Sequence, residues 1–271
     1  MKRVLFDRSI FHGDKFYKLR KSNLSTLVKN GRIKVYYTPG FLEETLLFSI
    51  RNLELFKEQW KFIISLNSSK WFKTPENIVT AELGNNMIGR KYYMWKEKKV
   101  KGMIKIADSY FAKQIPQKQY NKTIEDIKRY YVLKKEFRAK RLEVREAVKR
   151  ADYDFNKYVE DNAEWLIEKG IMPNHSNSSE YLLQWRNNRK SCRFTEQFIK
   201  SWFSTVYLPV VNHQLSVDKN DKIDAEQLAY LIWSDIMVSD DTRFMREAFN
   251  LLYGNSKKVF YTLPEFLEEI K

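Results

Sequence analysis

The stretch DAEQLAYLIWSDIMVSDDTRF, residues 224–244, decides the fold class. A helical pattern over residues 224–233 leads directly into a short apolar strand, Ile236–Val238, and a second helix is expected over residues 241–253. A buried strand enclosed by two helices is typical of βαβ units, in which neighbouring strands run parallel.

The two ends of the chain repeat this alternation of strands and helices. At the amino-terminal end we expect strands at residues 3–6 and 33–37 and helices at residues 18–30 and 41–53. At the carboxyl-terminal end we expect a strand at residues 258–262 and a helix opened by Pro264, a residue favoured in the first helical turn. The sequence therefore predicts an α/β fold with a small parallel sheet flanked by helices.

The middle of the chain has a different character, because strand patterns nearly vanish there. Residues 121–150 carry eleven basic against five acidic side chains within one expected helix, and further helices are expected at residues 180–189 and 195–208. We therefore expect three parts: an amino-terminal half-domain at residues 1–85, a mostly α-helical basic insertion at residues 86–208, and a carboxyl-terminal half-domain at residues 209–271.

The charge balance points to an anionic partner. The 271 residues include 49 Lys and Arg against 34 Asp and Glu, a formal net charge of +15. Nucleic acid is the commonest partner of so basic a protein, although a lysine-rich surface also serves solubility alone. The single cysteine, Cys192, excludes a disulfide framework. We find no leader pattern and no apolar run long enough for a membrane span, so we expect a cytoplasmic protein without a membrane partner.

Acidic residues follow the expected strands or open the helices beside them. Asp7 follows the first strand, Glu44 lies one turn into the helix after the second, Asp224 opens a helix, and Asp241 follows the third strand. Because ligands collect outside the carboxyl ends of parallel strands, these carboxylates can form one acidic pocket. Their mutual repulsion would be offset by one or two hard cations, Mg²⁺ or Mn²⁺. A helix cap is the competing interpretation of Asp224.

Four segments resemble the motifs of the PIN-domain (PIN-like) nuclease family, in the order in which that family has them. They are FDRSIF at residues 6–11, VYYTPGFLEETL at 35–46, the stretch at 224–244, and KKVFYTLPEFLEEI at 257–270. The resemblance covers about the first 60 and the last 50 residues. Two departures are a serine at position 239, where threonine is common in the family, and the long insertion.

The resemblance implies a metal-dependent endoribonuclease that hydrolyses RNA phosphodiester bonds with metal-activated water, leaving 5′-phosphate and 3′-hydroxyl ends. It also implies a role as a toxin or defence effector. Carried over to this chain, the catalytic and metal-binding residues are Asp7, Glu44, Asp224 and Asp241. The supporting residues are Ser9 and Ser239, together with Glu43 and Asp240, which compete with Glu44 and Asp241 for their positions.

The insertion has two interpretations. Its basic side chains are candidates for a nucleic-acid-binding surface: Lys128, Arg129, Lys135, Arg138, Arg141 and Arg145. Its aromatic side chains could stack on unpaired bases, although we favour a core position for them: Tyr92, Tyr93, Trp95, Tyr130 and Tyr131.

Three alternatives to the ribonuclease remain open. The first is a catalytically inactive PIN-like module that binds RNA or DNA, and the second is a structure-specific DNA nuclease. In the third, the inserted helices dock a protein partner that inhibits or recruits the domain. The expected substrate is RNA, with single-stranded DNA as the other candidate.

Overall fold

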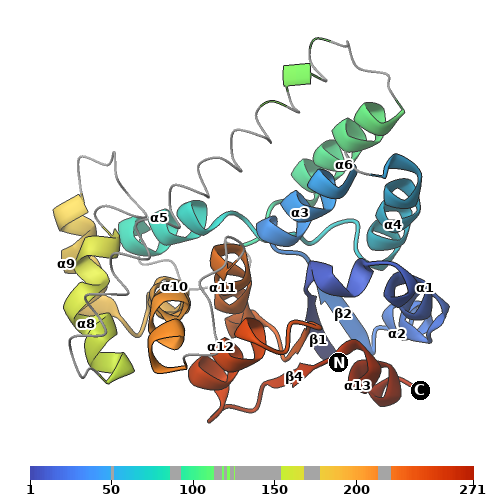
Figure 1. Ribbon diagram of the computed structural model, residues 1–271. Coiled ribbons are helices and arrows are strands. Elements are labelled where there is room, and N and C mark those ends of the chain that lie inside the picture. The colour runs from blue at the N-terminus through green and yellow to red at the C-terminus, as the bar shows by residue number, and fades with distance from the viewer. Residues whose placement is uncertain are drawn as a thin grey trace.

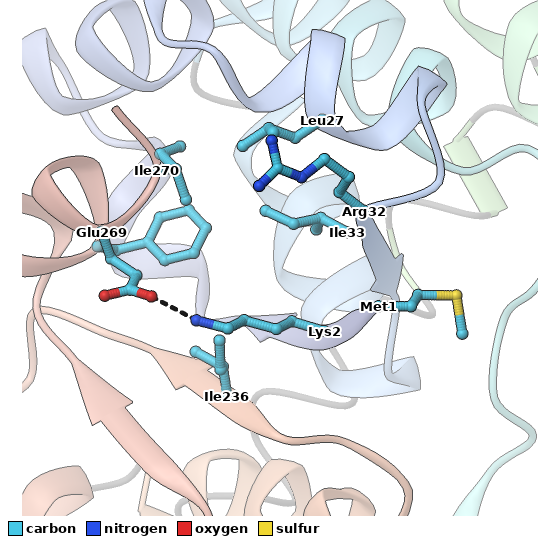
Figure 2. Close-up of a pocket in the computed structure, with 9 residues that line it drawn as sticks. Met1, Lys2, Leu27, Arg32, Ile33, Ile236, Glu269 and Ile270 are labelled. Carbon is cyan, nitrogen blue, oxygen red and sulfur yellow. Dashed lines mark hydrogen bonds and ion pairs between the residues drawn. The ribbon is translucent and has the colours of Figure 1, made fainter.

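A computed structural model gives the fold (Figure 1). It describes residues 1–49, 52–85, 93–112, 154–167, 178–212 and 221–271, together with the isolated positions 118, 121, 122 and 125. Its centre is a four-stranded sheet in the order β2-β1-β3-β4, with every neighbouring pair parallel. The strands are β1 (Lys2–Phe6), β2 (Ile33–Tyr36), β3 (Ile236–Val238) and β4 (Val259–Tyr261). The predicted mixed α/β class with a small parallel sheet is confirmed.

The sheet brings the two ends of the chain together, because β1 lies between β2 and β3. Leu5 is in register with Tyr36 on one side and with Met237 on the other. Successive side chains of a strand point to opposite faces. Accordingly, Leu5 and Met237 belong to one hydrophobic core, whereas Val4 and Phe6 belong to another.

Helices cover both faces of the sheet. The helices of the first half are η1 (Arg8–Phe11), α1 (Asp14–Lys21), α2 (Leu24–Lys29), α3 (Pro39–Ser49), α4 (Leu53–Leu66), α5 (Pro75–Asn85) and α6 (Glu97–Phe111). Those of the second half are α8 (Phe155–Trp165), α9 (Ser178–Asn188), α10 (Arg193–Val211), α11 (Asp221–Ala229), η4 (Tyr230–Trp233), α12 (Phe244–Tyr253) and α13 (Leu263–Glu269).

The two cores divide these helices between the two faces. Side chains of α5, α8, α10, α11 and α12 share the core of Leu5. Side chains of α1, α2, α3, α4, α6 and α13 share the core of Val4. Helices from the expected insertion, such as α8 and α10, therefore pack in the same core as the sheet. The expected boundary between residues 208 and 209 falls inside α10.

The expected helix at residues 18–30 is wrong, because two shorter helices, α1 and α2, occupy that region. Ser22 separates them: its hydroxyl donates to the carbonyl of Leu19 at 2.6 Å and accepts from the backbone N–H of Leu24 at 3.3 Å. Such local side-chain bonds compete with the helical pattern. Gly31 ends the second helix with a φ of 68°, the left-handed region that favours glycine.

The sheet continues beyond β2 as two single bridges. Tyr37, directly after β2, pairs in parallel with Trp71, and Phe72 pairs antiparallel with Met94. Through these two bridges, the segment before α6 lies beside the residues that follow the carboxyl end of β2. None of the described helices combines the length and hydrophobicity needed to cross a membrane.

Candidate active site

The candidate site lies where the order of the strands reverses. From β1 the chain first adds β2 on one side, and much later it adds β3 and β4 on the other. Asp7 directly follows β1, and its backbone N–H donates to the carbonyl of Val238 at the end of β3, at 2.9 Å. Open parallel sheets bind ligands at such a switch point, outside the carboxyl ends of the strands.

The Asp7 side chain is the centre of this site and is only 5% exposed. Its Oδ2 accepts hydrogen bonds from the backbone N–H of Ser9 at 3.2 Å and from the Ser239 hydroxyl at 2.9 Å. Its Oδ1 accepts from Nε2 of Gln227 at 3.3 Å. A buried carboxylate needs such donors because removal of its charge from water is costly. The three donors also fix the orientation of both oxygens.

The two serine hydroxyls connect the loops that follow β1 and β3. Oγ of Ser9 accepts from the backbone N–H of Asp240 at 3.1 Å. Oγ of Ser239 accepts from the backbone N–H of Asp241, also at 3.1 Å, while it donates to Asp7. Both supporting serines expected from the sequence are therefore beside Asp7, and each has a defined hydrogen bond.

Asp240 and Asp241 each have a structural partner. Oδ1 of Asp240 accepts from the backbone N–H of Leu263 at 2.8 Å, and its Oδ2 pairs with Nζ of Lys15 at 2.8 Å. Oδ1 of Asp241 accepts from the backbone N–H groups of Arg243 and Phe244, at 3.0 and 3.1 Å. This bonding explains why α12 begins at Phe244 and not at Asp241, where a helix was expected.

The neighbouring residues Glu43 and Glu44 on α3 face different surroundings. Burial lowers the pKa of the Arg8 guanidinium, and the charges of Glu44 and Asp7 both act against this shift. The charge of Glu43 acts instead on the buried phenol of Tyr230. Glu44 is therefore the glutamate that shares an electrostatic environment with Asp7.

Arg8 is a member of the site that sequence reasoning missed. It is 4% exposed, and its Nη2 donates to Oε1 of Gln59. Among the described residues its Nε and Nη1 have no hydrogen-bond partner. Burial lowers the pKa of this guanidinium to about 10, although Glu44 and Asp7 act in the opposite direction. Arg8 thus supplies a positive charge beside two of the expected acids. Its position between Asp7 and Ser9 in the first motif was the available signal.

Gln227 is the second residue that was missed. It lies on α11 one turn after Asp224, so the two side chains point to the same side of that helix. Gln227 is 1% exposed, and its buried Oε1 has no hydrogen-bond partner in the part of the chain that the structure describes. Asp224, which the sequence put forward, is partly buried. Its spacing to Gln227 was the signal that could have identified the glutamine.

The chemistry of these donors fits a hard cation, because the available atoms are carboxylate, amide and hydroxyl oxygens. Gln227 faces the Asp7 carboxylate with its Nε2, and its Oε1, which has no hydrogen-bond partner among the described residues, is an acceptor of the kind that Mg²⁺ or Mn²⁺ takes. Among the described residues, however, no three His, Cys, Asp or Glu side chains are close enough to hold one metal ion. The predicted metal-binding role of the four expected acids therefore stays a prediction.

No model of a known protein family matches this chain. Comparison with curated proteins and with solved structures gives no match either. The candidate site therefore rests on its own geometry.

The expected basic nucleic-acid-binding residues at 128–145 lie outside the described residues, as do Tyr92, Tyr130 and Tyr131. Of the aromatic residues expected in the core, Tyr93 is 4% exposed and stacks on Trp233, with ring centres 4.1 Å apart. Trp95 is only partly buried.

Proposed function

We propose that this chain is a Mg²⁺- or Mn²⁺-dependent endoribonuclease whose site is built around Asp7. The observation that carries the proposal is the buried Asp7 carboxylate at the switch point of a parallel sheet, with both oxygens held in position by donors from η1, α11 and the loop after β3. The four ordered motifs and the net charge of +15 give it further support.

In this proposal Asp7 and the amide oxygen of Gln227 hold the ion, and Glu44, Asp224 and Asp241 contribute from the surrounding edge. The bound ion would supply an activated water and stabilise negative charge on the leaving oxygen. Ser239 keeps Oδ2 of Asp7 oriented. Arg8 offsets part of the negative charge of Asp7 and Glu44, so that fewer cations are needed to neutralise the site.

The test is cleavage of a labelled single-stranded RNA with Mg²⁺ or Mn²⁺, with and without EDTA. We expect Asp7→Asn to abolish a metal-dependent cleavage that the wild type shows. Asp14→Asn is the matched control, because Asp14 is an exposed aspartate on the neighbouring helix α1. Cleavage that survives Asp7→Asn would refute the proposed site, and a panel with single-stranded and branched DNA separates the ribonuclease from a DNA nuclease.

A second candidate function is a PIN-like module that binds RNA without cleaving it. Such a module would keep the Asp7 carboxylate in the three hydrogen bonds that the structure shows, with no ion required. It predicts that RNA is retained on the protein, equally in EDTA and in Mn²⁺, with no product formed by either metal.

A further inference from the structure

The segment between the bridges beyond β2 and helix α6 holds Trp95 on a fixed backbone. The N–H of Trp95 donates to the carbonyl of Trp71 at 3.0 Å, and the N–H of Lys73 donates to the carbonyl of Tyr93 at 2.9 Å. The carbonyl of Lys73 accepts from the buried Tyr230 hydroxyl at 2.6 Å. Because these bonds join the segment to the core, Trp95 and Lys73 keep a constant relative position.

Two ammonium groups approach the Trp95 ring. Nζ of Lys73 lies 5.7 Å and Nζ of Lys99 lies 5.8 Å from its centre. Each cation is attracted to the ring, yet the two repel each other. In the part of the chain that the structure describes, neither lysine has an acidic partner. A bound anion would relieve this repulsion.

Helix α6 extends the positive charge away from Trp95. Its buried side contains Val100 and Tyr110, which belong to the core. Its exposed side carries Lys98, Lys101 and Lys105, which follow one another over roughly 10 Å of helix. Within this row, Glu97 forms an ion pair with Lys101 at 2.6 Å. This row of lysines therefore keeps a net positive charge on the exposed side of α6, the helix that follows Trp95 in the chain.

This surface and Asp7 lie at the same edge of the sheet. Tyr37 follows the carboxyl end of β2 and pairs with Trp71, whose carbonyl binds the N–H of Trp95. Asp7 follows the carboxyl end of β1, the strand next to β2. Neighbouring strands are only about 5 Å apart. A strand of nucleic acid that extends over three such spacings, from β1 across β2 and Trp71 to Trp95, would reach from one place to the other.

We propose that Lys73, Trp95 and Lys99 form a binding subsite for single-stranded nucleic acid. An unpaired base lies against the Trp95 ring, and the two ammonium groups contact the phosphates on either side of it. The lysine row of α6 continues the contact with the backbone. A single strand fits better than a duplex because only an unpaired base exposes its face to an aromatic side chain.

This inference concerns binding alone and holds whether or not Asp7 supports cleavage. The appropriate measurement is therefore the affinity of a fluorescein-labelled 12-nucleotide single-stranded RNA in EDTA, over a range of KCl concentrations. The double variant Lys73→Gln/Lys99→Gln removes both charges. The matched control is Lys29→Gln/Lys257→Gln. It removes two exposed charges near the amino ends of β2 and β4, whereas the subsite follows the carboxyl end of β2.

We expect the first double variant to make the slope of log affinity against log salt shallower by about 1.4, the value for two lost phosphate contacts of a single strand. The control variant should leave the slope within about 0.5 of the wild type, because its lysines lie far from the subsite. Equal slopes for the two double variants would overturn the proposal.

The ring is tested separately. Trp95→Leu should weaken binding about tenfold, whereas Trp95→Phe should retain most of the affinity, because a phenyl ring still stacks on a base. Circular dichroism identifies a Trp95 variant that fails to fold. In that case the salt dependence of binding by the lysine variants decides the outcome. Equal losses for Leu and Phe, or equal affinity for a 12-base-pair duplex and the single strand, would also overturn the subsite.

Discussion

The hydroxyl of Ser239 donates a hydrogen bond of 2.9 Å to Oδ2 of Asp7, a residue 232 positions away in the chain. The same hydroxyl accepts from the backbone N–H of Asp241. A single oxygen thus connects the central acid of the candidate site to the loop after β3. The loss of this oxygen affects both segments.

We expect Ser239→Ala to destabilise the protein by about 1–3 kcal/mol, because a buried carboxylate and a backbone N–H lose their partner together. Urea denaturation measures the change. The control is Ser65→Ala: Ser65 is an exposed residue of α4 whose hydroxyl donates to the carbonyl of Phe62. If Ser239→Ala destabilises the protein no more than the control does, Ser239 does not hold Asp7 in position as proposed.

Gln227→Glu tests for a cation at Asp7 without measuring activity. A second carboxylate would face Oδ1 of Asp7 across a contact that is now 3.3 Å, and two charges so close repel unless a cation lies with them. We expect the variant to melt roughly 5 °C below the wild type in EDTA and to recover in Mn²⁺. An identical loss in EDTA and Mn²⁺ would argue against metal binding here.

Glu82 links α5 to the start of α10. Its carboxylate accepts from the Tyr93 hydroxyl at 3.0 Å, from the N–H groups of Phe194 and Thr195 at 3.0 and 2.7 Å, and from the Thr195 hydroxyl at 2.8 Å. We expect Glu82→Gln to cost about 2 kcal/mol, because an amide cannot accept from all four donors. Glu76→Gln, an exposed change on the same helix, is the control for urea denaturation. Equal costs would show that the four bonds contribute nothing.

We expect Lys258 to make the stability of the folded protein depend on pH. Its Nζ donates to the carbonyl of Ser234 at 2.7 Å, and burial lowers its pKa from 10.5 to about 8. Between pH 8 and 10.5 the unfolded chain holds this proton more tightly than the folded protein, so the contribution of Lys258 to stability rises with pH. We expect the wild type to gain about 1 kcal/mol over Lys258→Met from pH 7.5 to pH 10, measured by urea denaturation. A difference that stays constant with pH would contradict the lowered pKa.

Strongly patterned segments were predictable from the sequence, because their structure follows from burial along a strand or a helix. The strand Ile236–Val238 was predicted with its observed bounds, and its three side chains are buried. The start of α12 and the break at Ser22 were not, since side-chain bonds to the backbone decide them. A hydrophobic pattern carries no information about such bonds.

The site was only partly predictable, for a similar reason. Asp7 and Ser239 could be singled out because each directly follows a strand. Gln227 was missed because it is 220 residues from Asp7 and has no charge, and only its spacing of one helical turn from Asp224 pointed to it. Arg8 is an arginine within an apolar segment, and its burial depends on Gln59, which lies on another helix.

The order of the strands also governs when this site can form during synthesis. β1 is made first, yet β3, its neighbour on one side, is made more than 200 residues later. While the ribosome makes the intervening helices, that side of β1 has unpaired backbone groups that can bind strands of other chains. Over the same period Asp7 lacks the hydrogen bonds from Ser239 and Gln227. The nascent chain thus cannot complete the Asp7 environment before the segments that carry Gln227 and Ser239 emerge.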